Sequence, residues 1–496
     1  MAELRLNLNS PALKGMSSED DGLKDAVSKR MMHKETYEEA WQRVLSMKNS
    51  ARDQERLLEV KAYMDGGKLV RDPQRVNKKF AKVEALQLYE QIEEQKRKSM
   101  LRDMVENTPD NYELVTTDKQ FSDMLQVLKN EELIVFDVET TGVDVWNDVI
   151  VGHVLTATSI DRHYYVPTDH KDATLPQLAR DYVAKHLRPI YEDDSIKKIA
   201  HNAKFDMQML ANNFNIELRG LAWDTQEAMI LLNENEPTYA LKPLVSKYLR
   251  DKSYTYGQLF GDKGFDEVPL DEALAYAAKD GDVTYRLFEF QRYQMKKVGN
   301  IYEYFTEIEM PLMTIVSDME LMGYDIDVEY ANKVADRLRK ESEAIEKDIV
   351  NELNPYYWKA SGKDNDINIG SPAQLKKAIE GITGKEPKSS DKNTLKQLNR
   401  EGYEVFGRIL DYRDKRKLLT TYYEALPNLI QEKTGRVHTR YHQNGAKTGR
   451  FSSGEDKNDV SKDGVINIQN QSPEARSLFV APPGKFIVNA DFSAQE

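Results

Sequence analysis

The sequence predicts a central α/β domain, preceded by a polar helical segment and followed by a mainly helical part. Between about residues 112 and 292, short apolar runs alternate with stretches in which apolar residues recur at helical spacing. Such alternation is typical of helices packed on one central sheet. Residues 1–110 are polar and mostly helical in pattern, and helical spacing dominates again from about residue 300 onward. A chain of 496 residues has room for roughly two to four domains.

Composition excludes several classes of protein. No apolar run approaches the length of a membrane span, and the N-terminus lacks the apolar core of a signal peptide. The sequence contains no cysteine, which excludes disulfides, cysteine-ligated zinc and iron–sulfur clusters, and a reducing cytoplasm is the simplest location. The net charge of -13 argues against a nucleic-acid partner for the chain as a whole, so local charge is the better guide.

The individual helices and strands are predicted from the spacing of apolar residues and from the residues that typically begin or end such elements. Leu133 begins an apolar run that is too short for a helix and rich in branched and aromatic residues, which indicates a buried strand. Ser371 before Pro372 is typical of a helix start, and Gly323 of a helix end. We expect further strands at 150–158, 163–167, 196–200 and 486–491, and helices at 37–60, 80–105, 175–187, 207–214, 308–322, 328–353 and 408–426.

The strand that begins at Leu133 ends in two acids, Asp137 and Glu139, whose side chains point to the same face because side chains alternate along a strand. Asp206 follows a second apolar strand, and Asp280 lies on an expected helix, four residues after Tyr276. Buried carboxylates need compensating positive charge. Together the four acids could hold two Mg²⁺ or Mn²⁺ ions about 3.5–4 Å apart, a spacing suited to a displacement reaction at phosphorus.

These stretches resemble the three exonuclease motifs of the DEDD family, in the tyrosine-bearing branch found in family A (DNA polymerase I-like) DNA polymerases. The first motif is similar to Phe136-Asp-Val-Glu-Thr-Thr141, the second to His201-Asn-Ala-Lys-Phe-Asp206 and the third to Tyr276-Ala-Ala-Lys-Asp280. The resemblance implies an RNase H-like domain over residues 111–295 that removes nucleotides from a single-stranded DNA 3′ end. Its catalytic residues would be Asp137, Glu139, Asp206, Tyr276 and Asp280, and the four acids would bind metal.

The same resemblance places Thr140 and Asn202 beside the terminal nucleotide. Tyr256 could stack on a base, since every base offers a π-face, or could be a residue of the core. Residues 1–110 contain no catalytic constellation. We interpret them as a helical extension or docking arm, with a DNA clamp at the basic stretch 71–79 as the alternative.

A second constellation is a basic stretch between residues 411 and 450. Nine Lys and Arg stand against four Asp and Glu, in a chain that is acidic overall. Tyrosines and histidines are interleaved with them, a mixture that suits contact with phosphate, sugar and base. A solvated helix face is the alternative interpretation of such a charge run.

This part also resembles family A polymerases, now in the thumb and palm, which implies a partial polymerase domain over 296–496 with the start of an α+β palm. Asp491-Phe-Ser-Ala-Gln-Glu496 resembles polymerase motif A, in which Asp491 would bind metal and Glu496 would exclude ribonucleotides. The residues that the resemblance assigns to DNA binding in this part are Arg413, Lys417, His442, Arg450, Gln469 and Asn470.

The polymerase match stops after motif A, without the fingers helix or a second palm aspartate. One metal ligand cannot build a two-metal site. We therefore expect the N-terminal portion of a replicative polymerase with a proofreading exonuclease. Its polymerase site would need a C-terminal fragment or a spliced extension, and its source would be a bacteriophage acting in the host cytoplasm. The alternatives are a non-catalytic primer-template-binding subunit of a split polymerase and a DEDD exonuclease that acts on RNA.

Overall fold

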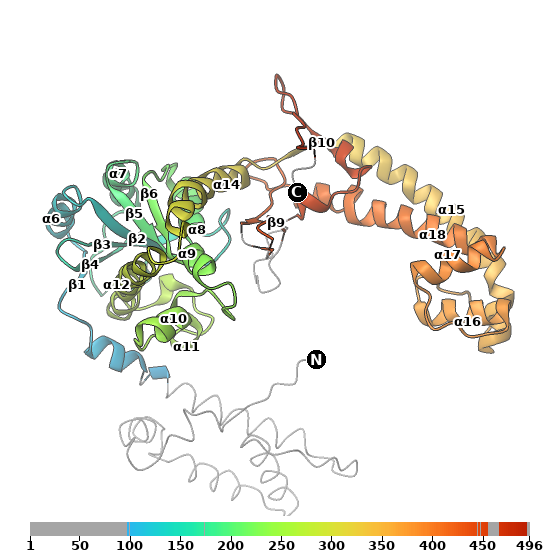
Figure 1. Ribbon diagram of the computed structural model, residues 1–496, viewed down its shortest axis with the longest axis horizontal. Coiled ribbons are helices and arrows are strands. Elements are labelled where there is room, and N and C mark those ends of the chain that lie inside the picture. The colour runs from blue at the N-terminus through green and yellow to red at the C-terminus, as the bar shows by residue number, and fades with distance from the viewer. Residues whose placement is uncertain are drawn as a thin grey trace, which may run out of the picture. The chain divides into compact units, whose positions relative to one another are not determined.

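The computed structural model describes residues 97–98, 100–172, 174–443, 445–446, 448–454 and 466–493 (Figure 1). The described chain forms two compact units, one ending at Met310 and the other beginning at Pro311. The helix predicted at 37–60 and the basic stretch 71–79 lie outside the described residues, as does most of the helix predicted at 80–105.

The first unit is built on a six-stranded mixed sheet with strand order β1-β4-β3-β2-β5-β6 (Figure 1). Strand β2 pairs antiparallel with β3 and parallel with β5, so it has a neighbour on both sides. The strands are β1 (Tyr112–Leu114), β2 (Leu133–Thr140), β3 (Ile150–Ala157), β4 (Arg162–Pro167), β5 (Lys197–Ala200) and β6 (Leu221–Asp224).

Helix α12 is the long helix of this unit, and it packs along β1 to β5. Small residues allow it to approach the sheet closely: a Cβ on Gly281 would lie 2.6 Å from Thr156 Oγ1. A larger side chain there would push the helix away from the strands. The helices of the unit are α6 (Asp118–Leu128), α7 (Arg180–Tyr191), α8 (Ala203–Phe214), α9 (Thr225–Leu232), α10 (Leu241–Leu244), α11 (Tyr256–Leu259), α12 (Leu270–Met295) and α13 (Ile301–Tyr304).

The second unit is mainly helical, with two short two-stranded sheets. One buried apolar cluster joins α15, α16, α17 and α18, and another joins the start of α15 to the segments after α18. The helices are α14 (Met310–Met322), α15 (Val328–Ser361), α16 (Pro372–Thr383), α17 (Lys392–Arg400) and α18 (Glu404–Leu418), and the strands are β7 (Asp325–Ile326), β8 (Tyr441–His442), β9 (Ser452–Ser453) and β10 (Phe479–Val480).

Several predicted elements are confirmed. The predicted strands at 150–158, 163–167 and 196–200 correspond to β3, β4 and β5. Ser371 caps α16 by accepting the N–H of Gln374, and Pro372 is the first helical residue. α14 ends directly before Gly323, which has a φ of +60° that glycine adopts without strain.

Other predictions are wrong in informative ways. The helix predicted at 175–187 begins only at Arg180 and ends at Tyr191, because the Gln177 side chain bonds the backbone of His170 and Asp172 and so belongs to the preceding loop. α15 continues past Pro355 to Ser361, because packing of its apolar face outweighs the lost hydrogen bond. The strand predicted at 486–491 does not form. No described strand pairs with this stretch, and a strand without a partner leaves its backbone groups unbonded.

No helix in the described part of the chain has the length and apolar character needed to cross a membrane.

Candidate active site

Two acids of the site come from β2, in the middle of the sheet. Asp137 and Glu139 project from the same face, while Val138 between them is buried on the other. This arrangement is the one predicted from strand alternation. The register of β2 shifts between Glu139 and Thr140, so the pairing with β3 is irregular directly after the second acid. Glu139 therefore lies beside this irregularity, one residue before the end of the strand.

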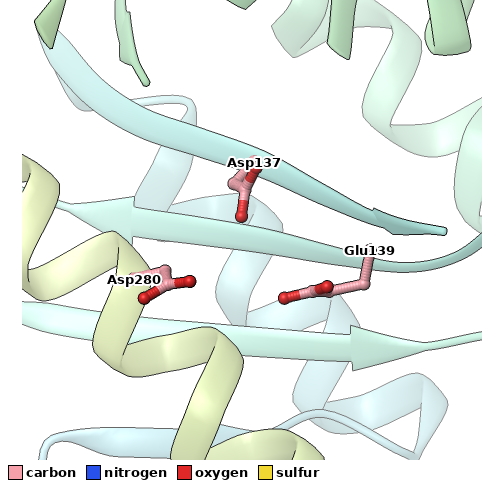
Figure 2. A group of neighbouring side chains, drawn as sticks. All are labelled: Asp137, Glu139 and Asp280. Atoms are coloured by element: carbon pink, nitrogen blue, oxygen red, sulfur yellow. The ribbon is translucent and has the colours of Figure 1, made fainter. Parts of the chain in front are cut away.

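The third acid, Asp280, comes from α12 and meets the strand acids in space (Figure 2). One oxygen from each of Asp137, Glu139 and Asp280 lies within 4.8 Å of the others. Residues separated by more than 140 positions thus form one cluster of three carboxylates.

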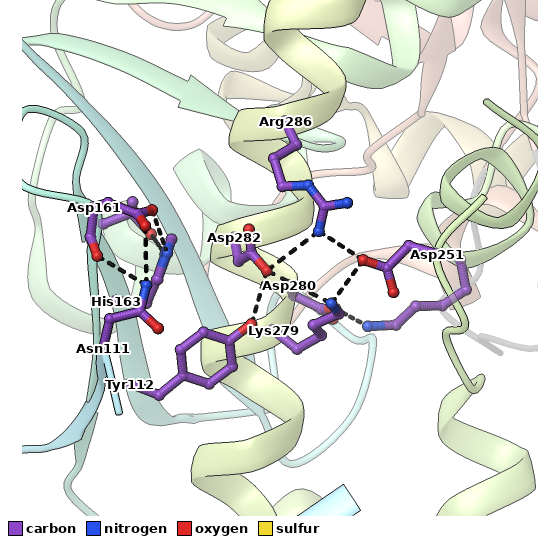
Figure 3. A network of polar contacts seen from close by, with 11 residues as sticks. Asn111, Tyr112, Asp161, His163, Asp251, Lys279, Asp280, Asp282 and Arg286 are labelled. Atoms are coloured by element: carbon purple, nitrogen blue, oxygen red, sulfur yellow. Dashed lines mark hydrogen bonds and ion pairs between the residues drawn. The ribbon is translucent and has the colours of Figure 1, made fainter. Parts of the chain in front are cut away.

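One side of α12 is joined to neighbouring segments by a network of polar contacts (Figure 3). The Tyr112 hydroxyl donates to Asp282 at 2.8 Å, and Asp282 lies 3.5 Å from both Lys279 and Arg286. These two cations also pair with Asp251, at 2.9 and 2.6 Å. The network ties α12 to β1 and to the loop before α11, which holds the helix that carries Asp280.

The fourth predicted acid, Asp206, lies in the first turn of α8 and is only 2 % exposed. Its Oδ1 accepts the backbone N–H of Val138 at 3.3 Å, directly between the two strand acids. It also shares a hydrogen bond with the carboxyl of Asp137. The structure thus places Asp206 beside the cluster of three acids and in contact with one of them.

Asp224 positions α8, and sequence reasoning missed it. It is fully buried, and its carboxylate accepts the N–H of Ala203 at 2.6 Å, of Gln226 at 2.7 Å and of Glu227 at 3.0 Å. It therefore caps the start of α9 and also holds the start of α8. Asn202, directly before α8, is exposed and has a φ of +65°. Asp224 could have been found from the sequence as an N-cap before an apolar helix.

Lys242 on α10 is the second residue that sequence reasoning missed. It is 8 % exposed and forms an ion pair with Asp280. Its ammonium also lies 4.4 Å from the centroid of the Tyr276 ring. A lysine this deeply buried requires negative partners. The signal in the sequence was a single lysine within the apolar stretch 241–245.

Burial controls the protonation of the site. Desolvation raises the pKa of Asp137 to about 6, against the opposing effect of Lys242. It also raises the pKa of Glu139 well above its usual range, as does the neighbouring charge of Asp137, and it raises the pKa of Asp206. Burial lowers the pKa of Lys242 to about 7. A buried set of acids with one cation has an unmet need for positive charge.

The donor set fits a divalent cation. The oxygens of Asp137, Glu139 and Asp280 converge within the span of one coordination sphere, and Asp206 lies next to them. All these donors are carboxylate oxygens, which suit Mg²⁺ and Mn²⁺. Lys242 supplies part of the missing positive charge by pairing with Asp280.

Tyr276 is half-buried on the same face of α12 as Asp280. Burial, followed by the charges of Glu139 and Asp137, raises its pKa, so the phenol keeps its proton at neutral pH.

Tyr256 packs edge-on against Tyr276, with 6.1 Å between ring centroids, and its hydroxyl donates to the carbonyl of Lys263 at 2.6 Å. These contacts favour the core interpretation of Tyr256. Thr140 Oγ1 donates to the carbonyl of Gly142 at 2.6 Å.

The basic stretch of the second unit is partly used for internal contacts. Arg413 donates to the carbonyl of Ser390 at 3.0 Å, Lys415 pairs with Glu341, and Arg436 pairs with Asp325 at 3.1 Å. Each of these three part-exposed side chains therefore has a partner within the unit.

The remaining predicted DNA-binding residues of this unit lie near its two small sheets and on α18. Lys417 is exposed on α18, and Arg450 is exposed just before β9. His442 contacts the carbonyl of Gly454 at 3.2 Å, and Gln469 donates to that of Phe451 at 3.0 Å. Asn470 follows in the same short 3₁₀-helical turn as Gln469.

Motif A is only partly described. Asp491 is exposed, and Glu496 lies outside the described residues. The apolar side chains before Asp491 are also exposed: Phe486 is 91 %, Ile487 67 % and Val488 85 % accessible. Within the described residues, Asp491 does not join any cluster of acids that could hold a metal.

Comparison with known proteins agrees with this geometry. Residues 112–295 match the family model described as 3′-5′ exonuclease, and residues 329–496 match the model described as DNA polymerase family A. A solved structure of the POL domain of Pol1 from M. smegmatis, in complex with DNA primer-template and dNTP, shares the fold. Its TM-score is 0.55 at 19 % identity, over 75 % of this chain and 59 % of that one. The matched domains are those of exonuclease-bearing DNA polymerases.

The chain accordingly belongs to the family A DNA polymerases. It is 32 % identical over 406 residues to DNA polymerase I of Pseudomonas aeruginosa, and this alignment covers 78 % of this chain and 42 % of that protein. It is also 32 % identical over 395 residues to DNA polymerase I of Chloroflexus aurantiacus, covering 76 % and 39 %. The chain spans less than half the length of these relatives.

Proposed function

We propose that the first unit is a 3′→5′ exonuclease that removes nucleotides from a DNA 3′ end and serves as the proofreading site of a replicative DNA polymerase. The observation that carries the proposal is the convergence of Asp137, Glu139 and Asp280 within 4.8 Å, with Asp206 beside them. Partly or fully buried carboxylates that converge without sufficient positive charge favour a metal-dependent reaction.

Asp137, Glu139, Asp206 and Asp280 would hold two Mg²⁺ or Mn²⁺ ions. When bound, such ions supply an activated water and stabilise the leaving oxygen of a phosphodiester. Tyr276 keeps its proton, so its hydroxyl can donate a hydrogen bond that orients the scissile phosphate or the attacking water. Asn202 is exposed at the start of α8 and, with Thr140, would contact the terminal nucleotide.

The test is the shortening of 5′-labelled single-stranded DNA by the full chain in Mg²⁺ or Mn²⁺. We expect a ladder of products that EDTA and Asp137→Ala each abolish. A matched control, Asp123→Ala, changes an exposed acid on α6 and should leave the rate unchanged. Metal-dependent shortening that survives Asp137→Ala would refute the assignment.

The same assay separates the alternatives. An RNA oligonucleotide of the same sequence, if it were shortened faster than the DNA, would favour an RNA exonuclease. Binding of DNA without any cleavage would favour a non-catalytic primer-template-binding subunit. The match of residues 329–496 to the polymerase family argues for DNA.

We further propose that the second unit holds primer-template duplex through Arg413, Lys417, His442, Arg450, Gln469 and Asn470. Its polymerase site would contain Asp491 and Glu496 and would be completed by further polypeptide, either a separate C-terminal fragment or a spliced extension. The exposed apolar side chains of residues 486–488 support this, because such stretches are normally covered. Template-directed incorporation by this chain alone would refute it.

A bacteriophage source, and with it action in a host cytoplasm, is part of the same proposal. Sequencing the DNA on both sides of the gene tests it: genes for phage structural proteins are the expected neighbours, and a bacterial chromosome on both sides would contradict it.

A further inference from the structure

Residues 100–106 are helical and lie outside the part of the chain matched by the exonuclease family model, which begins at residue 112. Their apolar side chains nevertheless pack on the exonuclease domain. Met100, Leu101 and Met104 contact a buried cluster that includes Leu259 and Phe260 of the α11 region. The helix is therefore part of the packed domain and not a detached linker.

The same cluster supports Tyr276. The Tyr276 ring packs against it, with 5.4 Å between its centroid and that of Phe260. The helix at 100–106 and the tyrosine beside the acid cluster thus rest on one group of apolar side chains. A change in the volume of one side chain in such a group is transmitted to its neighbours.

The helix and the site line one cavity of about 190 Å³. Met104 and Pro109 line it, and so do Lys242, Leu259 and Tyr276. Lys242 and Tyr276 therefore border the same open space as Met104, and the helix forms part of its wall.

The chain directly after the helix is tied to the exonuclease domain by a polar contact. Thr108 Oγ1 donates to the carbonyl of Met104 at 3.1 Å, and the Tyr112 hydroxyl donates to Asp282 on α12 at 2.8 Å. Asp103 lies 4.0 Å from Lys252. We propose that the helix at 100–106 is a positioning element of the exonuclease site, which fixes the Tyr276 ring through Met104. This inference rests on the proposed exonuclease function.

The mechanism is steric. Met104→Ala removes the thioether end of a side chain that lines the cavity, and the surrounding groups relax partly into the space. A displacement of the Tyr276 hydroxyl by a fraction of an ångström weakens its alignment with substrate. Misplacement of about 1 Å can cost about 100-fold in rate, so we expect a loss of about tenfold.

The test uses the full chain with Met104→Ala and the matched control Glu106→Ala, which changes an exposed residue of the same helix. We expect kcat on single-stranded DNA to fall about tenfold in Met104→Ala, with KM within twofold of wild type. Met104→Leu should restore the rate, and Glu106→Ala should not change it. Equal rates in Met104→Ala and Glu106→Ala would overturn the proposal.

A double-mutant cycle distinguishes positioning from loss of stability. If Met104 acts through the Tyr276 hydroxyl, Met104→Ala should have no further effect in a Tyr276→Phe background. Effects that multiply would overturn the proposal, because a general loss of folded protein lowers both backgrounds equally.

A second readout does not depend on activity. The ¹⁹F resonance of 3-fluorotyrosine at position 276, measured without DNA, should move in Met104→Ala and stay in place in Glu106→Ala. A resonance that does not move overturns the positioning role. Absence of exonuclease activity in the wild-type chain would instead count against the proposed function.

Discussion

Asp224→Asn tests whether the hidden acid behind α8 organises the candidate active site. One carboxylate oxygen of Asp224 accepts the N–H of Ala203, and the other accepts those of Gln226 and Glu227. An asparagine has one acceptor oxygen, which can still cap α9. Its NH₂ group must then face the N–H of Ala203, so two buried donors meet without an acceptor.

The magnitude follows from that single lost contact. A buried donor left without a partner costs about 1–3 kcal/mol, so we expect the free energy of unfolding to fall by about 2 kcal/mol. Asp224→Ala loses the cap of α9 as well, which adds about 1 kcal/mol. Asp123→Asn is the matched control, since Asp123 is exposed on α6; it should change stability by less than about 0.5 kcal/mol.

Denaturant unfolding measures the stability, and electron paramagnetic resonance of Mn²⁺ binding measures the site. Asp206 lies one turn into the helix that Asp224 anchors, so Mn²⁺ affinity should fall in Asp224→Asn and remain unchanged in the control. A variant that is as stable as the control, and that binds Mn²⁺ as tightly as wild type, would refute the reasoning.

Three further predictions follow from single contacts. Lys242→Met should destabilise the metal-free protein by about 3 kcal/mol, because Asp280 loses its buried partner. Mg²⁺ should raise the Tm of this variant more than that of wild type. An equal rise of Tm in calorimetry would count against this prediction. Burial lowers the pKa of His153 to about 3, so the stability gained by keeping it neutral is present above pH ~6.5 and is lost as the pH falls from there toward ~3. His153→Asn should therefore reduce the slope of unfolding free energy against pH by about 1.4 kcal/mol per pH unit in that window, and an unchanged slope would contradict it. Phe486→Ser should alter stability by less than about 0.5 kcal/mol, because the ring is 91 % exposed; a loss above about 1 kcal/mol in urea unfolding would mean that the segment is packed.

Much of the site could be predicted from local pattern. The period of two along β2 places Asp137 and Glu139 on one face, and the period of the helix places Tyr276 beside Asp280. Neither inference requires knowledge of the other segments. Element boundaries were less predictable: α7 begins late because Gln177 bonds the loop before it, and α15 passes Pro355 because its packed face outweighs a local helix breaker.

The site residues that the sequence did not predict are those whose partners lie far away along the chain. Lys242 has no local signal that distinguishes it from any other lysine, and only the approach of α10 to α12 brings it to Asp280. Asp224 could be recognised as the cap of α9, but its bond to Ala203 depends on β5 and β6 being neighbours in the sheet.

The sequence by itself determined the α/β class of the first unit and which residues could act as metal ligands, because side-chain chemistry and backbone period are local properties. Tertiary structure alone decided that Asp206 bonds to the strand between the two acids, that Lys242 pairs with Asp280, and that residues 100–106 and Tyr276 pack on the same apolar cluster. These contacts join residues that are distant in sequence, and their energy depends on burial, which no local pattern specifies.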